Sequence, residues 1–389
     1  MSCKISDICE INKDNISKKD SYSYINYLDT ANLNEGRIDE IKKLKVGEDK
    51  IPSRAKRKVK KDDILISTVR PNQKHYGIIK DNEIENLIVS TGFAVLSPKS
   101  MVNGKYLYNY LTLPHITEYL QGVAETSTTA YPSITPAIIG NLELDLPPLE
   151  EQEKIANILS SLDDKIELNN EMNKTLEEMA QALFKRWFVD FEFPDENGKP
   201  YKSSGGEMVE SELGMIPKGW EVGTLGDMVE INSGKRPKKK SKERNEVFNI
   251  PLIGASSIMG YTNNVLYEER ILVIGRVGTH GIVQRFNEKV WPSDNTLVIK
   301  TEYYEYMNQI LNVIDYKALN VGSTQPLITQ TDIKNVEILL PEKIILNQFE
   351  LLVKSVYDIV NTNIVNINYL IELRDTLLPK LMSGEIRVK

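Results

Sequence analysis

The chain is poor in the residue types that build most catalytic and metal sites. Its 389 residues include only three histidines, His75, His115 and His280, and two cysteines, Cys3 and Cys9. Scattered histidines without companion ligands disfavour a metal site or a Ser-His-Asp triad. Two cysteines so close together make neither a disulfide framework nor a zinc site, and each is expected to be a small core-facing thiol.

Long apolar runs are lacking too. No stretch of about 18 consecutive apolar residues occurs, so no segment is expected to span a bilayer. The N-terminal sequence has no charged-then-apolar leader. Together with the cysteine content, this predicts a cytoplasmic protein without membrane association. A length of 389 residues with 41% hydrophobic content exceeds one core and fits two domains.

Nucleotide-binding motifs are missing as well. There is no G-x-x-x-x-G-K-[ST] loop and no Asn-Pro-Pro-aromatic box. The glycines of residues 275–281 have the wrong spacing for a phosphate cradle and indicate a turn. The acidic residues of 194–199 lie where we expect a linker, which would not hold a metal geometry. We therefore expect a recognition module with no cofactor of its own rather than an enzyme.

What the chain does contain is an internal repeat. Residues 129–184 align with residues 323–378 at a constant offset of 194, without a gap, and fourteen of the 56 pairs are identical, among them Pro147/Pro341 and Asn169/Asn363. So long a period excludes a solenoid and indicates one domain-plus-helix unit used twice. Such a duplication predicts an internal near-two-fold axis.

Two regions of mixed pattern precede the two copies of the helix. In the first, β-branched runs predict strands near residues 63–69, 87–90, 93–96 and 142–146, and residues 106–120 predict a helix interrupted near Pro114. In the second, residues 225–231 echo residues 5–11 at an offset of 220, and residues 271–277 are expected to match residues 64–70.

The two helices carry heptad patterns. Apolar residues recur at alternating intervals of four and three residues, which is typical of a long helix that pairs with another. The first seam comprises Ile155, Leu159, Leu162, Ile166, Asn169, Asn173, Leu176, Ala180 and Leu183. The second comprises Phe349, Val353, Val356, Val360, Asn363, Ile367, Leu370, Arg374 and Leu377. The first helix extends at least 29 residues, about 43 Å, before an aromatic cluster.

A two-fold relation would make these helices antiparallel, with Asn169 and Asn363 either fixing the register from within the seam or facing solvent at a frayed edge. We expect an α+β protein in which two mixed α/β domains are separated by two long antiparallel coiled-coil helices. The expected segments are a first domain at 1–146, a first spacer helix at 147–193, a linker at 194–216, a second domain at 217–340 and a second spacer helix at 341–389.

Charge is sorted along the chain. The net charge of −7 mildly disfavours nucleic acid, yet residues 50–61 and 235–244 each hold seven basic residues. Such runs are either solvated loops or phosphate-binding clusters, and Arg, Asn and Gln can read base edges. The candidate DNA-binding residues are Arg54, Lys56, Arg57, Lys58, Lys60, Lys61, Arg70, Gln73, Lys74, His75, Lys235, Arg236, Lys238, Lys239, Lys240, Arg276, His280 and Arg285.

Three segments carry a resemblance to a known family. Residues 146–156, 164–170 and 176–188 resemble the central conserved region of type I restriction–modification specificity subunits. Residues 214–220 with 225–227 resemble the start of that family's target-recognition domain, and residues 373–386 resemble its C-terminal conserved region. The resemblance covers essentially the whole chain.

The resemblance implies a non-catalytic subunit that reads a bipartite, asymmetric target in double-stranded DNA. Each mixed domain would read one half, and the helices would set the gap between halves, about 13 base pairs for a 43 Å rod. The helical regions, with an acidic face at residues 150–178, would dock two modification (methyltransferase) subunits, and two restriction (motor-nuclease) subunits would join. S-adenosylmethionine, ATP and Mg²⁺ are expected on those partners.

Two departures accompany the resemblance. The first unit begins without a counterpart of Ile216–Trp220, and Arg374 is a charged residue in an apolar seam, a position where the helix pair could meet a partner subunit. Two alternatives stay open: a fused restriction enzyme with its own nuclease, and a helical scaffold that dimerises. The sequence does not reveal the DNA target.

Overall fold

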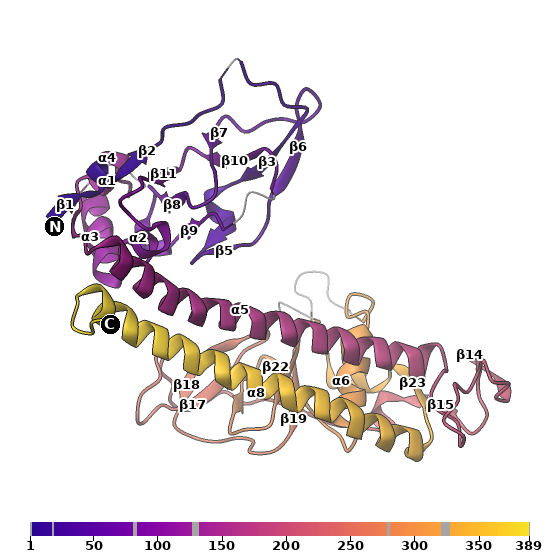
Figure 1. Ribbon diagram of the computed structural model, residues 1–389. Helices are drawn as coiled ribbons and strands as arrows, with labels where there is room; N and C mark the ends of the chain where they lie inside the picture. The colour runs from indigo at the N-terminus through magenta and orange to yellow at the C-terminus, as the bar shows by residue number, and fades with distance from the viewer. Residues whose placement is uncertain are drawn as a thin grey trace. The chain divides into compact units, whose positions relative to one another are not determined.

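The chain folds into two compact units. The structure is a computed structural model that describes residues 2–17, 19–80, 84–126, 132–277, 281–319 and 327–388. One unit comprises Met1–Asn169 with Val365–Lys389, and the other comprises Asn170–Ile364. The boundary falls inside the two longest helices, α5 (Leu149–Phe184) and α8 (Lys343–Met382), so each unit holds one mixed domain and a part of both helices (Figure 1).

The first unit is built on two four-stranded sheets, in the orders β2-β11-β8-β9 and β6-β3-β10-β7, and all their pairs are antiparallel except β10 with β3. Its strands are β1 (Ser2–Lys4), β2 (Cys9–Ile11), β3 (Tyr24–Leu28), β4 (Leu33–Asn34), β5 (Arg37–Ile38), β6 (Lys42–Lys45), β7 (Ala55–Lys58), β8 (Ile64–Ser67), β9 (Tyr76–Ile78), β10 (Leu87–Ser90), β11 (Phe93–Pro98) and β12 (Glu143–Asp145). Its shorter helices are α1 (Ile5–Ile8), η1 (Thr30–Asn32), η2 (Pro71–Gln73), α2 (Gly104–Leu111), α3 (Pro114–Glu125) and α4 (Pro136–Gly140).

The predicted interruption near Pro114 is confirmed. Asn103 caps α2, its side chain accepting a hydrogen bond from the backbone N of Tyr106, and α2 ends at Leu111. Pro114 starts α3 at the position where a missing N–H leaves no helical bond unmade. The fully buried strands β8 and β10 are short runs of β-branched and leucine residues, as expected of strands covered on both faces.

The second unit repeats this plan with one sheet in the order β16-β22-β19-β20 and a smaller one in the order β18-β17-β21. Its strands are β13 (Met208–Ser211), β14 (Gly214–Pro217), β15 (Glu221–Thr224), β16 (Glu230–Ser233), β17 (Ile250–Ile253), β18 (Ile258–Thr262), β19 (Ile271–Gly275), β20 (Val283–Phe286), β21 (Trp291–Pro292), β22 (Thr296–Lys300) and β23 (Glu337–Leu340). Its shorter helices are η3 (Lys185–Val189), η4 (Leu225–Asp227), α6 (Tyr304–Val313) and α7 (Gln330–Lys334).

The repeat extends to individual hydrogen bonds. The backbone N of Ile5 donates to Leu142 O at 3.0 Å, and the backbone N of Leu225 donates to Val336 O at 2.8 Å. The donors differ by 220 residues and the acceptors by 194, which are the two offsets expected from the sequence. Antiparallel pairing of β1 with β12 and of β15 with β23 keeps the same offsets. The domain start and the segment before each long helix are therefore equivalent in the two units.

One expected match is wrong by a single residue. From the sequence, Ile271 is expected to be equivalent to Ile64, an offset of 207 residues. In the structure, the backbone N of Ile134 donates to Thr68 O, and the equivalent N of Ile328 donates to Arg276 O. The two accepting carbonyls are 208 residues apart, so Leu272 rather than Ile271 is equivalent to Ile64. Ile64 and Leu272 accordingly face the core that contains the long helices of their unit. Successive strand residues face opposite sides, so only contacts across the sheet fix the register of two uniformly apolar runs.

The expected linker at 194–216 is folded. β13 and β14 form an antiparallel hairpin, and the rings of Phe193 and Tyr201 stack with centroids 4.6 Å apart. Phe193 also stacks on Trp220 at 5.2 Å. The segment is rich in glycine, serine and charge, but its few aromatic side chains bury enough apolar surface to pack it into the second unit.

Within each unit the long helices pack against each other and run in opposite directions. In the second unit Asn173 bonds to Asn363, while Phe184, eleven residues later on α5, contacts Phe349, fourteen residues earlier on α8. In the first unit Leu159 of α5 and Leu381 of α8 share one core, and Asp163, four residues after Leu159, bonds to Arg374, seven residues before Leu381. Every seam residue predicted from the heptads is buried or half-buried.

Candidate nucleic-acid interface

The first basic run forms an edge strand rather than a loop. β7 lies at the end of its sheet beside β10, and its other edge bonds to residues 14–16, since the backbone N of Ile16 donates to Lys56 O at 2.7 Å and that of Lys58 donates to Asp14 O at 3.0 Å. Arg54, Lys56, Lys60 and Lys61 are exposed on and around it. The backbone edge of β7 is thus covered by residues 14–16, so the exposed lysines are not needed to protect it from strand addition by another chain.

The basic residues of this run differ in exposure and in their partners. Lys58 makes an ion pair with Asp20, and this hydrogen bond is the main reason that the pKa of Asp20 falls to about 2. Arg57 is half-buried, and burial lowers the pKa of its guanidinium. Lys56, which precedes both of them, is exposed. The exposed members are thus better placed for phosphate contacts than the two internal ones.

A second basic edge was missed by sequence reasoning. β6, at the opposite end of the same sheet, carries Lys42, Lys43 and Lys45, and Lys43 Nζ lies 4.2 Å from the ring centroid of Tyr24. The signal in the sequence is three lysines in four residues, but it falls outside the densest run. Both edges of this sheet are therefore basic.

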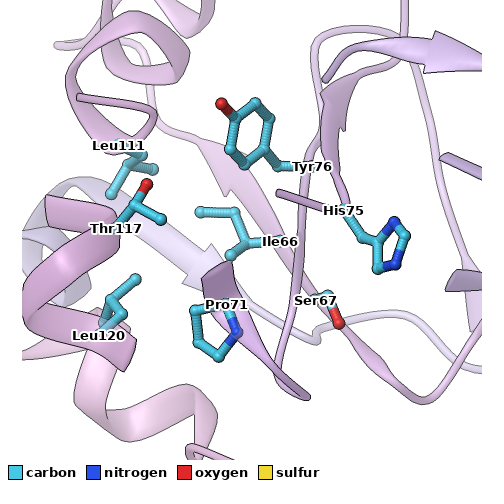
Figure 2. A pocket seen from close by; sticks show the side chains of 8 residues that line it. All are labelled: Ile66, Ser67, Pro71, His75, Tyr76, Leu111, Thr117 and Leu120. Carbon is cyan, nitrogen blue, oxygen red and sulfur yellow. The ribbon is translucent and has the colours of Figure 1, made fainter. Parts of the chain in front are cut away.

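The loop from Arg70 to His75 has an unusual backbone. Arg70 and Lys74, at either end of η2, adopt positive φ values of 48° and 55°, a region that non-glycine residues seldom occupy. Pro71 is buried and lines a small hollow together with Leu111, Thr117 and Leu120 of the neighbouring helices (Figure 2). Such strain is maintained only where surrounding structure fixes it, and it is frequent in ligand-contacting loops.

Side chains of this loop divide between solvent and the protein. Gln73 and Lys74 are exposed, although Lys74 Nζ lies 3.3 Å from Glu35 Oε1. The His75 ring points away from Leu111 and Leu120 in Figure 2, and its Nδ1 lies 2.9 Å from Leu33 O. Gln73 and Lys74 are thus presented outward by a loop held at its base.

The second basic run is an exposed loop held at several points. Lys235, Arg236, Lys238, Lys239 and Lys240 are basic residues outside regular structure, and the three consecutive lysines 238–240 lie at its middle. Two carbonyls of the loop are fixed from the strands beneath, since Trp291 Nε1 donates to Lys235 O at 2.6 Å and Thr262 Oγ1 donates to Lys239 O at 2.8 Å. Arg236 Nε lies 3.2 Å from Asp294 Oδ2. The backbone is fixed while the lysines project from it.

Two further candidates, Arg276 and His280, follow β19. Arg276 follows β19 and is half-buried, with its carbonyl bound by the backbone N of Ile328. His280 lies outside the described residues.

Arg285 is placed differently from the expectation. On β20 it lies between two tyrosine rings, its guanidinium carbon 3.4 Å from the centroid of Tyr357 and 5.0 Å from that of Tyr304. Its Nη1 also lies 2.7 Å from the carboxylate of Glu305, which is fully buried. Arg285 is therefore already engaged in an internal ion pair, which the buried carboxylate requires, and its contact with DNA stays a prediction.

The seam asparagines lie inside the helix pair. Asn169, Asn173 and Asn363 are 2%, 9% and 7% exposed, which excludes the frayed-edge alternative. Asn363 Nδ2 donates to Asn173 Oδ1 at 2.8 Å, so the observed pair is offset from the equivalent residues Asn169 and Asn363. The pair satisfies two buried amides and fixes the local register of the second unit.

Arg374, the charged seam residue, has its partner within the chain. Its Nη1 donates to Asp163 Oδ1 of α5 at 3.0 Å and its Nη2 donates to Asp375 Oδ1 at 2.8 Å. An arginine in an apolar seam is tolerated when its charge is paired and its stem packs. The residue thus joins the two helices of the first unit, and nothing about it requires a second protein.

Three further features are expected from the sequence: the lack of a metal site, the lack of a membrane span, and two free thiols. Across the described ranges, no three His, Cys, Asp or Glu side chains gather as metal ligands would. Among the helices of those ranges, none has the length and apolarity to cross a bilayer. Cys9 is buried and Cys3 half-buried; both are free thiols, and burial raises the pKa of Cys9 to about 12.

Comparison with known proteins gives one consistent result. A family model described as the type I restriction modification DNA specificity domain matches residues 1–178 and 217–368. The type I restriction enzyme HindI specificity subunit of Haemophilus influenzae is 30% identical over 413 aligned positions, which cover 86% of this chain and 89% of that protein. The MjaIX specificity subunit of Methanocaldococcus jannaschii is 31% identical over 333 positions, covering 78% of this chain and 74% of that protein.

A solved structure shares the fold. The crystal structure of a type I restriction–modification system S subunit from M. genitalium superposes with a TM-score of 0.59 at 15% identity, covering 98% of this chain and 95% of that one.

Proposed function

Because the chain belongs to the family of type I restriction–modification DNA specificity subunits, we propose that its two mixed domains each read one half of a bipartite, asymmetric target in double-stranded DNA. The chain is a DNA-recognition subunit and is itself non-catalytic, since other subunits of these systems carry the enzymatic activities. We propose the cytoplasm as its site of action, because that is where it would meet the DNA.

The asymmetry of the target is supported by one scaffold carrying two sets of loops. The four-stranded sheets β2-β11-β8-β9 and β16-β22-β19-β20 have the same order. The basic segments do not correspond, because one is edge strand β7 before β8 and the other is the loop at 235–240 after β16. Base identity is read by side chains on such variable elements, whereas lysines bound to phosphates position the protein. Because the two domains present different DNA-contacting segments, we expect the two half-sites to differ in sequence.

The gap between half-sites is assigned to the helices. α5 has 36 residues, longer than the 29 counted from the heptads, and 36 residues span about 54 Å at 1.5 Å each. The antiparallel contacts inside each unit support a helix pair whose length is the ruler. We propose that this pair holds the reading domains at a constant separation, which gives a non-specific spacer of fixed length.

Docking of the modification subunits is assigned to the outer face of the helices. Five large apolar side chains of α8 in the second unit are exposed: Ile344, Leu351, Leu352, Ile359 and Ile364. We call the first four the outer stripe. Leu351 is 73% and Ile344 61% exposed. Ile344 and Leu351 are seven residues apart, as are Leu352 and Ile359, and all four lie outside the seam. Exposed apolar residues that gather on one surface mark protein interaction sites. Two modification subunits, with two restriction subunits in the complete complex, are the proposed partners.

The outer stripe is tested by co-purification. Leu351→Lys with Ile359→Lys should abolish recovery of the modification subunit with the chain while leaving thermal unfolding unchanged. Asn347→Lys with Asn361→Lys adds the same charge at exposed polar positions of α8 and should not affect recovery. Retention of the partner by the first variant would assign docking to another surface.

The proposed function as a whole is tested by mapping methylated adenines in DNA exposed to the chain with its modification subunits. One bipartite motif with unlike halves and one spacer length is expected. A continuous motif, or two identical halves, would overturn the proposal.

A further inference from the structure

A charge cluster around one buried carboxylate joins the second mixed domain to α8, entirely within the second unit. Its centre is Glu305, at the start of α6, whose side chain is fully buried. Arg270 donates a hydrogen bond to Glu305 Oε1, and Arg285 Nη1 lies 2.7 Å from Oε2. Arg270 and Arg285 come from either side of the same sheet hairpin, β19–β20. We call these three residues with Tyr357 the Glu305 cluster.

Helix α8 reaches this cluster with a flat ring. Tyr357 lies against the Arg285 guanidinium, and its hydroxyl accepts hydrogen bonds from Asn308 Nδ2 at 3.3 Å and Gln309 Nε2 at 3.2 Å. Both amides belong to α6 and are 3% exposed. A planar guanidinium on an aromatic face has a defined orientation, unlike contact between aliphatic groups.

A second residue of α8 holds the start of α6. Glu350, seven residues before Tyr357, accepts a hydrogen bond from the backbone N of Tyr306 at 2.8 Å. Carboxylates are favoured at helix N-termini, where backbone N–H groups lack partners. Two turns of α8 therefore fix both the position and the direction of α6, which packs on β19 and β20.

The first unit does not make the same contacts. The positions 194 residues before Glu350 and Tyr357 are Ala156 and Asp163, and Asp163 instead pairs with Arg374 of α8. There the loop before α2 is held by a neutral group, since Gln152 Oε1 accepts from the backbone N of Asn103. The Glu305 cluster is thus not required by the fold that the two units share.

We propose that Arg285 is a positioning residue, and that the Glu305 cluster fixes the angle of the second reading domain on α8 and thereby the spacer length that the protein accepts. This proposal rests on the proposed function. Turning the domain on α8 would lose the stacking of Tyr357 on Arg285 and the two amide hydrogen bonds to the Tyr357 hydroxyl. These contacts are directional, so they penalise other orientations of the domain more than an apolar contact of equal size would. Loosening it should leave each half-site readable while relaxing the distance between them.

The test uses the full chain with its modification subunits on a DNA library in which the two mapped half-sites are separated by different spacers. Arg285→Met removes the charge and the stacking, and Tyr357→Leu removes only the ring from α8. Each should raise methylation at spacers one base pair longer or shorter, relative to the preferred spacer, by about tenfold. Arg285→Lys keeps the charge without the flat face and should give a smaller increase.

Lys289→Met is the matched control, because it removes an exposed positive charge just after β20 that pairs with Glu268. It should leave the spacer ratio unchanged. If Arg285→Met does not fold, Tyr357→Leu carries the test, since it leaves the Arg285–Glu305 pair inside the domain. An unchanged spacer ratio in Tyr357→Leu, with only a lower melting temperature, would overturn the positioning role. A wild type without a preferred spacer would instead overturn the proposed function.

Discussion

At the scale of single residues, a basic side chain has the role that its neighbours allow. Lys56 and Lys58 are two residues apart on β7, yet Lys58 is paired with Asp20 whereas Lys56 is exposed. Arg285 fits the pattern of a DNA-contacting residue in the sequence but lies between two tyrosines. A local pattern records that positive charge is present, but only the spatial neighbours show whether that charge is already engaged.

The lysines most suited to bind phosphate are the three that project from the fixed loop at 238–240. Replacing Lys238, Lys239 and Lys240 with Ala should make the negative slope of log K against log salt concentration less steep. The expected change is about 0.9 for each phosphate that is no longer neutralised, or about 2.7 if all three lysines contact phosphate. Fluorescence anisotropy with target DNA at several salt concentrations measures this slope.

The control removes the same charge elsewhere in the second unit. Lys199, Lys202 and Lys218 are exposed near the hairpin β13–β14, and their replacement by Ala should leave the slope unchanged. If both triple variants shift the slope equally, general charge rather than this loop governs affinity.

At the scale of elements, the heptads located the helices and their facing sides, because a period of 3.5 residues is a property of the chain alone. Their end points needed the structure. α5 starts at Leu149, directly after Pro147 and Pro148, and gives way after Phe184 to a π-helical turn, η3. Rings of Phe188, Trp220 and Phe349 pack around that turn, with Phe188 and Phe349 centroids 4.9 Å apart.

The asparagine pair gives a prediction at this scale. Asn363→Leu should destabilise the second unit by about 1–3 kcal/mol, because it leaves the buried Asn173 amide without its partner. The double change of Asn173 and Asn363 to Leu should cost less than the single change, since neither member of the pair is then left without the other. Urea unfolding followed by the fluorescence of Trp187 and Trp220 measures both.

Exposed Asn361, on the same helix, supplies the control, and Asn361→Leu should change stability by less than about 0.5 kcal/mol. Equal destabilisation by the single and the double change would show that the asparagines contribute through shape rather than through their hydrogen bond.

At the scale of the whole molecule, the duplication is the central feature. The same backbone hydrogen bonds recur at offsets of 220 and 194, so the scaffold was copied while insertions changed the surface between the copied points. The mixed helix-and-strand class, the recognition of the family and the DNA-reading role, all predicted from the sequence, are confirmed. The domain limits and the DNA-contacting residues stay predictions.

Shortening the helix pair tests the ruler. Deleting residues 162–168 of α5 together with residues 369–375 of α8 removes one heptad from each helix and keeps both seams in phase. It also removes Asp163 and Arg374 together, so neither charge is left unpaired. The preferred spacer should shorten by about three base pairs, because seven helical residues span about 10 Å. Methylation of the spacer library measures it.

Deleting residues 162–168 alone is the informative comparison, since it shifts one seam against the other and should reduce methylation at every spacer. A double deletion that keeps the wild-type spacer would show that the helices do not set the distance.

The sequence by itself determined the duplication, the two heptad seams and the family, because each is a periodicity or a motif written along the chain. Tertiary structure alone decided the one-residue register between β8 and β19, the packing of the segment at 194–216, and the roles of Arg285 and Arg374. Those depend on groups that meet through space: Tyr357 and Glu305 for Arg285, and Asp163 for Arg374. The electrostatic free energy of a charge is set by the nearest opposite charge and by burial, and neither follows from distance along the chain.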